Sequence, residues 1–182
     1  MEAPHPAGRV SVRVGTSGWA YPEWSPALYP PGLARGGFLR HYATVFGTCE
    51  VNVTAHRLQS AAAVSAWADA VGPGFRFVCK VHKGITHAAG MPRTDLAARF
   101  IASLAPLGDG LAAVLAQIPE ERPRDDDFLG SLLDALAGGP TVVVETADPS
   151  WRHPGVDAVL AAHGAVRCLN HAEGPPPASL PA

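Results

Sequence analysis

The sequence predicts an α/β fold, a TIM-like β/α barrel of which the chain holds about six of the eight β/α units. Six strand-like segments alternate with helix-like segments, which is the order of a parallel sheet with helical crossovers. The segment 111–118 is an almost unbroken apolar run, as expected of a strand buried on both faces. The sixth strand-like segment runs into the proline-rich stretch 174–177, so we expect an incomplete barrel.

The first half of the chain is expected to hold three strands and two helices. They are strand 10–14, helix 33–46, strand 49–53, a helix that Ser60 caps and that ends at 72–74, and strand 75–81. Strand 10–14 alternates apolar and polar residues, and the sequence Gly15-Thr16-Ser17-Gly18 follows it as a tight turn or a phosphate-binding loop. The simpler reading is the turn.

The second half is expected to repeat the pattern three times. Its elements are a helix that begins at Thr94 or Asp95, strand 111–118, helix 125–137, strand 141–145, helix 154–163 and strand 166–170. Acidic residues open helix 125–137, as a helix N-terminus prefers, and Pro154 suits the first turn of the last helix.

Length and composition indicate one domain, over 10–171, between a disordered N-terminal tail at 1–9 and a proline-rich tail at 172–182. The net charge of -2 makes nucleic acid an unlikely partner by charge alone. No apolar run approaches the roughly 20 residues of a membrane helix, so we expect no membrane partner. The 3 cysteines match no zinc spacing and indicate a reducing, cytoplasmic setting.

Polar residues gather where the predicted strands end. They are Thr16 and Ser17, Glu50 and Asn52 with Thr54, Lys80 and His82, Gln117, Glu145, and Asn170 with His171. In a parallel α/β sheet, ligands bind beyond the carboxyl ends of the strands. We therefore expect Glu50, Asn52, Lys80 and Glu145 to converge at one mouth.

Each of these residues also has a structural interpretation. Glu50 could pair with Lys80 across neighbouring strands without any catalytic role. His82 and His87 are too far apart along the loop to indicate a metal pair, so no metal ligand is predicted and the cofactor is unknown. Trp19 and Tyr21 belong to an aromatic loop that could stack on a sugar or base, or could fold back as a small core of its own.

Several blocks of the sequence carry a resemblance to a known family. The blocks are 15–19, Tyr21, Trp24 and 29–30; Phe46, Thr48, Glu50, Asn52, Thr54 and 57–58; 74–77, Lys80 and 85–87; 107–109, Gln117 and Pro119; and Glu145 with 149–151. Together they resemble the DUF72 (YecE-like) family, whose biochemical function is unknown. The resemblance implies a TIM-type barrel with a polar pocket at the strand ends. At that pocket it supports the set Glu50, Asn52, Lys80, His87, Gln117 and Glu145.

The chain also departs from this pattern. Ala55 and His56 stand where the family usually has Phe-Tyr, and Ala147 stands where it usually has Arg. An Asp common past the sixth strand is replaced by Asn170 and His171, and two further strand units are absent. A pocket without these groups either has lost its original chemistry or is completed by another chain.

Three functions follow as hypotheses. The leading one is an enzyme that acts on a small anionic or phosphorylated metabolite. Its expected catalytic residues are Glu50, Lys80, His87 and Glu145, and its expected substrate-binding residues are Thr16, Ser17, Trp19, Tyr21, Asn52, Arg57, His82, Gln117 and Trp151. The alternatives are a metal-assisted phosphodiester hydrolase and a non-catalytic assembly partner or degenerate family member that forms oligomers through open barrel edges.

Overall fold

One parallel sheet of six strands organises the computed structural model, which describes residues 12–170. The strand order β1-β2-β3-β4-β5-β6 follows the chain, so the expected incomplete β/α barrel is confirmed. The strands are β1 (Gly15–Ser17), β2 (Thr48–Val51), β3 (Arg76–Lys80), β4 (Leu111–Gln117), β5 (Thr141–Glu145) and β6 (Val166–Arg167). Within the described residues the sheet does not close, and β1 and β6 are its two edges.

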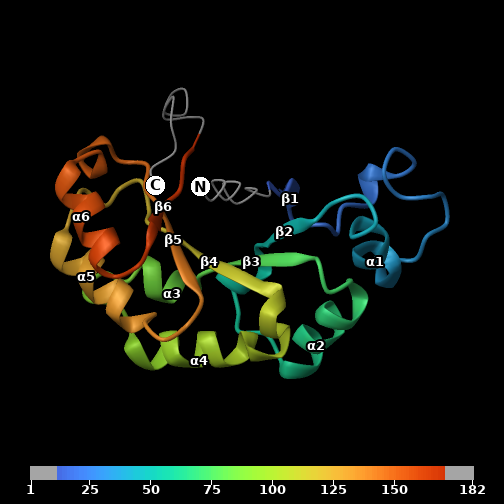
Figure 1. Cartoon of the computed structure of the whole chain (residues 1–182), viewed down its shortest axis with the longest axis horizontal. Helices are drawn as coiled ribbons and strands as arrows, with labels where there is room; N and C mark the ends of the chain where they lie inside the picture. Colours follow the sequence, from blue (N-terminus) through green and yellow to red (C-terminus); the bar gives the residue numbers. More distant parts are fainter. Residues whose placement is uncertain (1–11, 171–182) are drawn as a thin grey trace, which may run out of the picture.

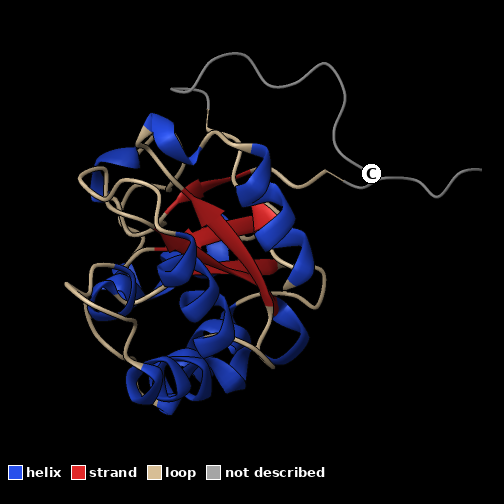
Figure 2. Ribbon diagram, turned by 90° about the vertical axis from the view of Figure 1, so that its left-hand side faces the viewer, coloured by secondary structure: helices blue, strands red, loops and turns tan. Residues whose placement is uncertain are grey.

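The helices follow the strands in the expected alternation. They are α1 (Phe38–Tyr42), α2 (Ala61–Ala70), α3 (Lys83–Thr86), α4 (Thr94–Leu104), α5 (Asp126–Ala135) and α6 (Pro154–Ala162). Short 3-10 turns are η1 (Pro22–Trp24), η2 (Arg35–Gly37), η3 (Val53–Ala55), η4 (Ala105–Gly110) and η5 (Pro149–Trp151). Figure 1 shows the strands as a curved row with the helices along its outer side, and Figure 2 shows the same layering from the side.

The helix-covered side of the sheet holds the hydrophobic core. Along β2 and β3, alternate residues are buried, and Val51, Phe77 and Cys79 join one cluster with Val64 of α2 and Phe100 of α4. The intervening residues, such as Glu50 and Lys80, therefore lie on the opposite, concave face of the sheet. In β4, Val114 and Leu115 are both buried although they point to opposite faces, as its apolar sequence predicts.

Two predicted strand boundaries are wrong. The first strand was expected at 10–14, but β1 is Gly15–Ser17, and the turn follows it at Gly18, which has a φ of 80°. β2 begins at Thr48, opposite Gly15, so Val12 and Val14 have no β2 partner and are 82% and 67% exposed. The sixth strand is also shorter than expected, because only Val166 and Arg167 pair with β5.

Two helix predictions also need correction. The expected helix 33–46 divides into η2 and the single-turn α1, because Gly36 and Gly37 weaken helix formation at its start. The loop after β3 contains a helix, α3, that the hydrophobic pattern does not predict, and His82 caps it. The two predicted tails and His171 lie outside the described residues.

Candidate functional site

Four polar side chains form a network at the carboxyl ends of β1, β2 and β3. Ser17 pairs with Glu50 in register, and its Oγ donates to Glu50 Oε1 at 2.9 Å. Asn52 Nδ2 donates to Ser17 Oγ at 2.6 Å, and Lys80 Nζ lies 3.9 Å from Glu50 Oε1. Because 3.9 Å exceeds a hydrogen bond, the ammonium group of Lys80 keeps its N–H donors for another acceptor.

A second network lies at the ends of β4 and β5. Gln117 and Glu145 are register partners, and Gln117 Nε2 donates to Glu145 Oε2 at 3.0 Å. Asn170, which follows β6, donates from Nδ2 to the other oxygen, Glu145 Oε1, at 2.9 Å. Since each oxygen accepts from an amide group, the Glu145 carboxylate is held in one orientation.

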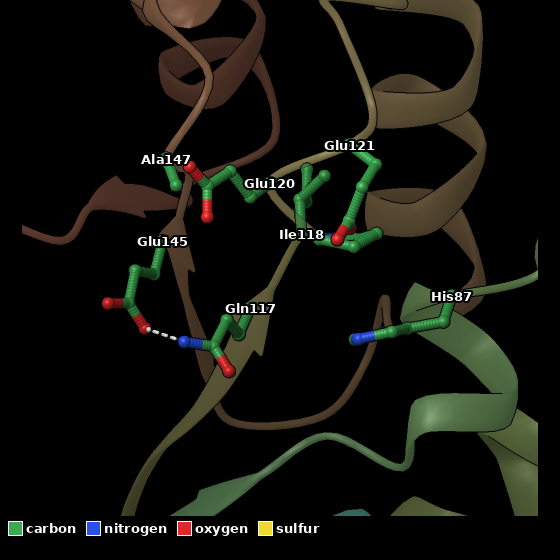
Figure 3. A pocket seen from close by; sticks show the side chains of 8 residues that line it. His87, Gln117, Ile118, Glu120, Glu121, Glu145 and Ala147 are labelled. Carbon is green, nitrogen blue, oxygen red and sulfur yellow. Dashed lines mark hydrogen bonds between the residues drawn. The ribbon is translucent and has the colours of Figure 1, made fainter.

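An open cavity of about 270 Å³ adjoins this second network. The residues that line it are His87, Gln117, Ile118, Pro119, Glu120, Glu121, Glu145 and Ala147. In Figure 3 the imidazole of His87 points across the cavity toward Gln117, and Glu120 and Glu121 extend from the loop after β4. The sequence-predicted residues His87, Gln117 and Glu145 therefore meet around one space.

The surroundings of His87 favour the uncharged form of its imidazole. Its pKa is lowered, first by burial of part of the ring and then by the positive charges of Lys83, Arg122 and Lys80, while Glu121 acts in the opposite direction. A neutral imidazole can accept a proton at one nitrogen and donate a hydrogen bond from the other.

A buried hydroxyl group holds the other side of this imidazole. Thr86 is 1% exposed, and its Oγ1 lies 2.8 Å from His87 Nδ1. Thr86 ends α3, whose first turn is fixed by a hydrogen bond from the Gly84 amide to His82 Nδ1 at 3.0 Å. His82 is thus engaged in capping the helix that carries His87 to the cavity.

The aromatic loop after β1 contributes both to the core and to a second hollow. Trp19 makes edge contacts with Trp67 of α2 and Phe77 of β3, at ring-centroid distances of 5.7 and 6.5 Å. Trp19, Tyr21 and Asn52 are also among the residues that line a cavity of about 240 Å³. The two sequence interpretations of this loop are therefore compatible: it packs on the core and leaves an aromatic surface exposed.

Five of the predicted substrate-binding residues line neither cavity. Ser17 and His82 belong to the contacts described above, and the other three are Trp151, Thr16 and Arg57. Trp151 is 0% exposed, and its indole Nε1 donates to the Arg122 carbonyl oxygen at 2.9 Å, so it belongs to the core. Thr16 points to the helix side, where its amide and hydroxyl groups contact Tyr42 Oη. Arg57 is exposed in the loop after η3. Trp151 is held in the core and Thr16 is held by Tyr42, so neither residue lines a cavity.

The prediction also left out residues that the structure brings to the site. Glu120 and Glu121 line the cavity, and Thr86 contacts His87. The sequence position of Glu120 and Glu121 was informative, because both follow the end of the predicted strand 111–118. Thr86 also belongs to the 85–87 block that resembles the family.

Residues 12–170 hold neither a metal-binding cluster nor a membrane-spanning helix. No cluster of three or more His, Cys, Asp or Glu side chains is placed to hold a metal ion. None of the helices in this part of the chain has the length and apolar character needed to cross a membrane.

The fold and the strand-end polar groups define an open β/α barrel with ionisable residues on its concave face. The family model described as "Protein of unknown function DUF72" matches residues 13–181, and the chain belongs to this family. A comparison with curated proteins gives no match.

Solved structures of DUF72 proteins share the fold. A Thermotoga maritima protein is 25% identical, with a TM-score of 0.73, and the match covers 85% of this chain and 63% of that one. An Enterococcus faecalis protein is 20% identical, with a TM-score of 0.71, over 85% of this chain and 59% of that one. The chain thus matches only about three fifths of the length of these relatives.

Proposed function

We propose that the concave strand-end face binds a small anionic or phosphorylated metabolite and acts on it by proton transfer. The observation that carries the proposal is the shared cavity of His87, Gln117 and Glu145, with Lys80 on the same concave face of the sheet. A cavity that gathers a neutral imidazole, a fixed carboxylate and a nearby ammonium group is suited to general acid–base chemistry.

Glu145 is our proposed general base. Its orientation is fixed by Gln117 and Asn170, yet each carboxylate oxygen has a second lone pair that can accept a proton or hydrogen bond from a ligand. Glu50, the other carboxylate considered from sequence, is bonded to Ser17 and lies near Lys80. We assign Glu50 to positioning the Lys80 ammonium group.

His87 is proposed as a hydrogen-bond donor to the ligand. Its lowered pKa favours the neutral imidazole at neutral pH. In that form His87 polarises a ligand oxygen by donating a hydrogen bond, while the proton itself moves to a carboxylate. The functional pair that we propose is therefore Glu145 with neutral His87.

Lys80 is the proposed contact for the anionic group. It lies on the concave face, its side chain is 20% exposed, and its ion pair with Glu50 at 3.9 Å leaves N–H donors unused by that contact. Exposed Arg57 receives no role in this proposal. Trp19, Tyr21 and Asn52 line the neighbouring hollow and are proposed to hold the remainder of the ligand.

The test uses inorganic phosphate as the probe, measured by calorimetry and by soaking crystals. We expect phosphate density at Lys80 and a loss of binding of about tenfold or more in Lys80→Met, since a charge-assisted contact disappears. Lys83→Met is the matched control, because Lys83 is the second lysine of the chain and is exposed on α3. Equal loss in both variants, or no bound phosphate, would refute anion binding at Lys80.

A second candidate is assembly through the open sheet edges, which specific exposed residues favour. Val12 and Val14 precede β1, Val166 lies in β6 and Leu169 follows it, and these side chains are 82%, 67%, 49% and 49% exposed. Unpaired edges with apolar side chains favour association. Assembly does not require a working pocket, so a family member that has lost its activity could still assemble. Ala147, which lines the cavity where the family usually has Arg, is consistent with such a loss.

Light scattering at several protein concentrations tests the assembly candidate. We expect a mass above that of one chain, which Leu169→Glu lowers. Met91→Glu is the control, because Met91 is 60% exposed and lies between α3 and α4, which follow the interior strand β3. A wild-type monomer at all concentrations would exclude association with a second copy.

The metal-assisted phosphodiester hydrolase stays a prediction of the sequence. Calorimetric titration with Mg²⁺ or Mn²⁺ tests it directly. If Glu50→Ala and Glu145→Ala bind the ion as the wild type does, these carboxylates are not its ligands and the hypothesis fails.

A further inference from the structure

The orientation of the Gln117 amide follows from the chemistry of its neighbour. A carboxylate group accepts hydrogen bonds through both of its oxygens and donates none. The NH2 group of Gln117 must therefore face Glu145, as the 3.0 Å contact from Nε2 to Oε2 has it. This leaves the carbonyl oxygen, Gln117 Oε1, directed away from Glu145 on a residue that lines the cavity.

The tautomer of His87 follows from Thr86 by a similar argument. Within residues 12–170, His87 Nδ1 is the hydrogen-bond partner found for the Thr86 hydroxyl group, which is 1% exposed. A buried hydroxyl hydrogen without an acceptor is costly, so the hydroxyl group donates to Nδ1. Nδ1 then carries no hydrogen, and the neutral ring holds its hydrogen on Nε2.

These two constraints fix a hydrogen-bond donor on one residue that lines the cavity and an acceptor on another. The His87 ring points into the cavity toward Gln117 in Figure 3, so its far nitrogen, Nε2, supplies the donor. Gln117 Oε1 supplies the acceptor. Neither group can reverse its polarity without breaking a hydrogen bond, to Thr86 in one case and to Glu145 in the other.

We propose that this cavity binds an uncharged carboxamide or lactam group, whose carbonyl oxygen accepts from His87 Nε2–H and whose N–H donates to Gln117 Oε1. A carboxylate of the same shape would have no hydrogen for Gln117 and would face Glu120, Glu121 and Glu145. This inference rests on the proposed function and deepens it: the ligand carries its anionic group at Lys80 and its carboxamide at His87. Thr86 is a positioning residue that acts through His87.

The tautomer is measured by nitrogen NMR on protein labelled with ¹⁵N histidine, with the His87 signals assigned by their loss in His87→Asn. We expect the Nε2–H form in the wild type. Thr86→Val should move the population toward Nδ1–H, and Thr86→Ser, which keeps the hydroxyl group, should restore the wild-type pattern. A wild-type protein in the Nδ1–H form would overturn the proposal.

The ligand class is tested with acetamide and acetate, which have the same shape but differ in charge and in hydrogen-bond donors. We expect acetamide to shift the His87 Nε2 signal at a concentration about tenfold or more below acetate, because a site built for an N–H group rejects a group that lacks it. Gln117→Met should abolish this preference, and Gln59→Met, which changes the second glutamine of the chain outside the cavity, should keep it.

The outcomes separate this inference from the proposed function. Acetate binding as well as acetamide, or neither probe shifting His87, would refute the carboxamide class. Phosphate binding at Lys80 would still stand in that case. Conversely, selectivity for acetamide without phosphate binding would support the carboxamide site. It would refute the proposal that the ligand has an anionic group bound at Lys80.

Discussion

The two faces of the sheet differ in what they contribute, although the same strands build both. On β3, Cys79 is 0% exposed against the helices, and burial raises the pKa of its thiol to about 12. The next residue, Lys80, lies on the concave face with its side chain 20% exposed and keeps an ammonium group near Glu50. Successive side chains of a strand point to opposite faces, so neighbouring residues can belong to the unreactive core and to the ionisable concave face.

The same contrast holds at β5. Val144 is 1% exposed in the core, while Glu145 lies at the cavity and accepts hydrogen bonds from Gln117 and Asn170. The helix-covered face should therefore control stability, and the concave face should tolerate substitution while it controls binding. Three experiments on substituted proteins test this division, from the largest expected effect to the smallest.

Trp151→Ala should have the largest effect. The side chain is 0% exposed and donates to the Arg122 carbonyl oxygen, so its removal leaves a cavity and an unsatisfied acceptor. We expect a loss of about 3–5 kcal/mol in the free energy of unfolding, measured by urea denaturation. Trp151→Phe should lose less because it keeps most of the packing. Unchanged stability in Trp151→Ala would return this residue to the ligand-binding role expected from sequence.

Adjacent substitutions on β3 test the two faces most directly. Cys79→Ser places a hydroxyl group in the apolar core and should cost about 1–3 kcal/mol. Lys80→Met should change stability by less than about 1 kcal/mol, because partly exposed ion pairs contribute little. Urea denaturation measures both. A larger loss in Lys80→Met than in Cys79→Ser would contradict the division between a stabilising face and a binding face.

The sequence predicted the fold well because its main signals are local. The apolar run of β4 and the acidic start of α5 led directly to elements whose boundaries lie within about two residues of those expected. The errors arose where pairing with a neighbouring strand sets the bounds of a strand. Val12 and Val14 fit the alternating pattern of a strand. However, β2 begins only at Thr48, opposite Gly15, so it has no residues that could pair with them.

The candidate site was predictable in part for the same reason. Strand-end position brought Glu50, Asn52 and Lys80 together, and it placed Gln117 beside Glu145. Sequence position could not show which face Trp151 occupies, because it lies in a 3-10 turn without strand alternation. Sequence position also could not show the contact between Thr86 and His87. That contact depends on the short helix α3, which the hydrophobic pattern does not predict.

The smallest predicted effect concerns His87 and the pH dependence of stability. Its pKa in the folded protein is lowered, by burial first and by Lys83, Arg122 and Lys80 next, so the unfolded chain binds the proton more readily. The contribution of His87 to stability is therefore fully present above the unfolded-state pKa of about 6.5 and is lost as the pH falls through that value toward the folded-state pKa.

His87→Asn should make the free energy of unfolding less dependent on pH between about pH 7 and pH 5. Urea denaturation at several pH values measures this, with His41→Asn as a control from α1, remote from the cavity. If His87→Asn leaves the slope unchanged, the ring is not held neutral by its surroundings. The donor role that we give it on the concave face would then lose its electrostatic basis, whereas the core on the other face would be unaffected.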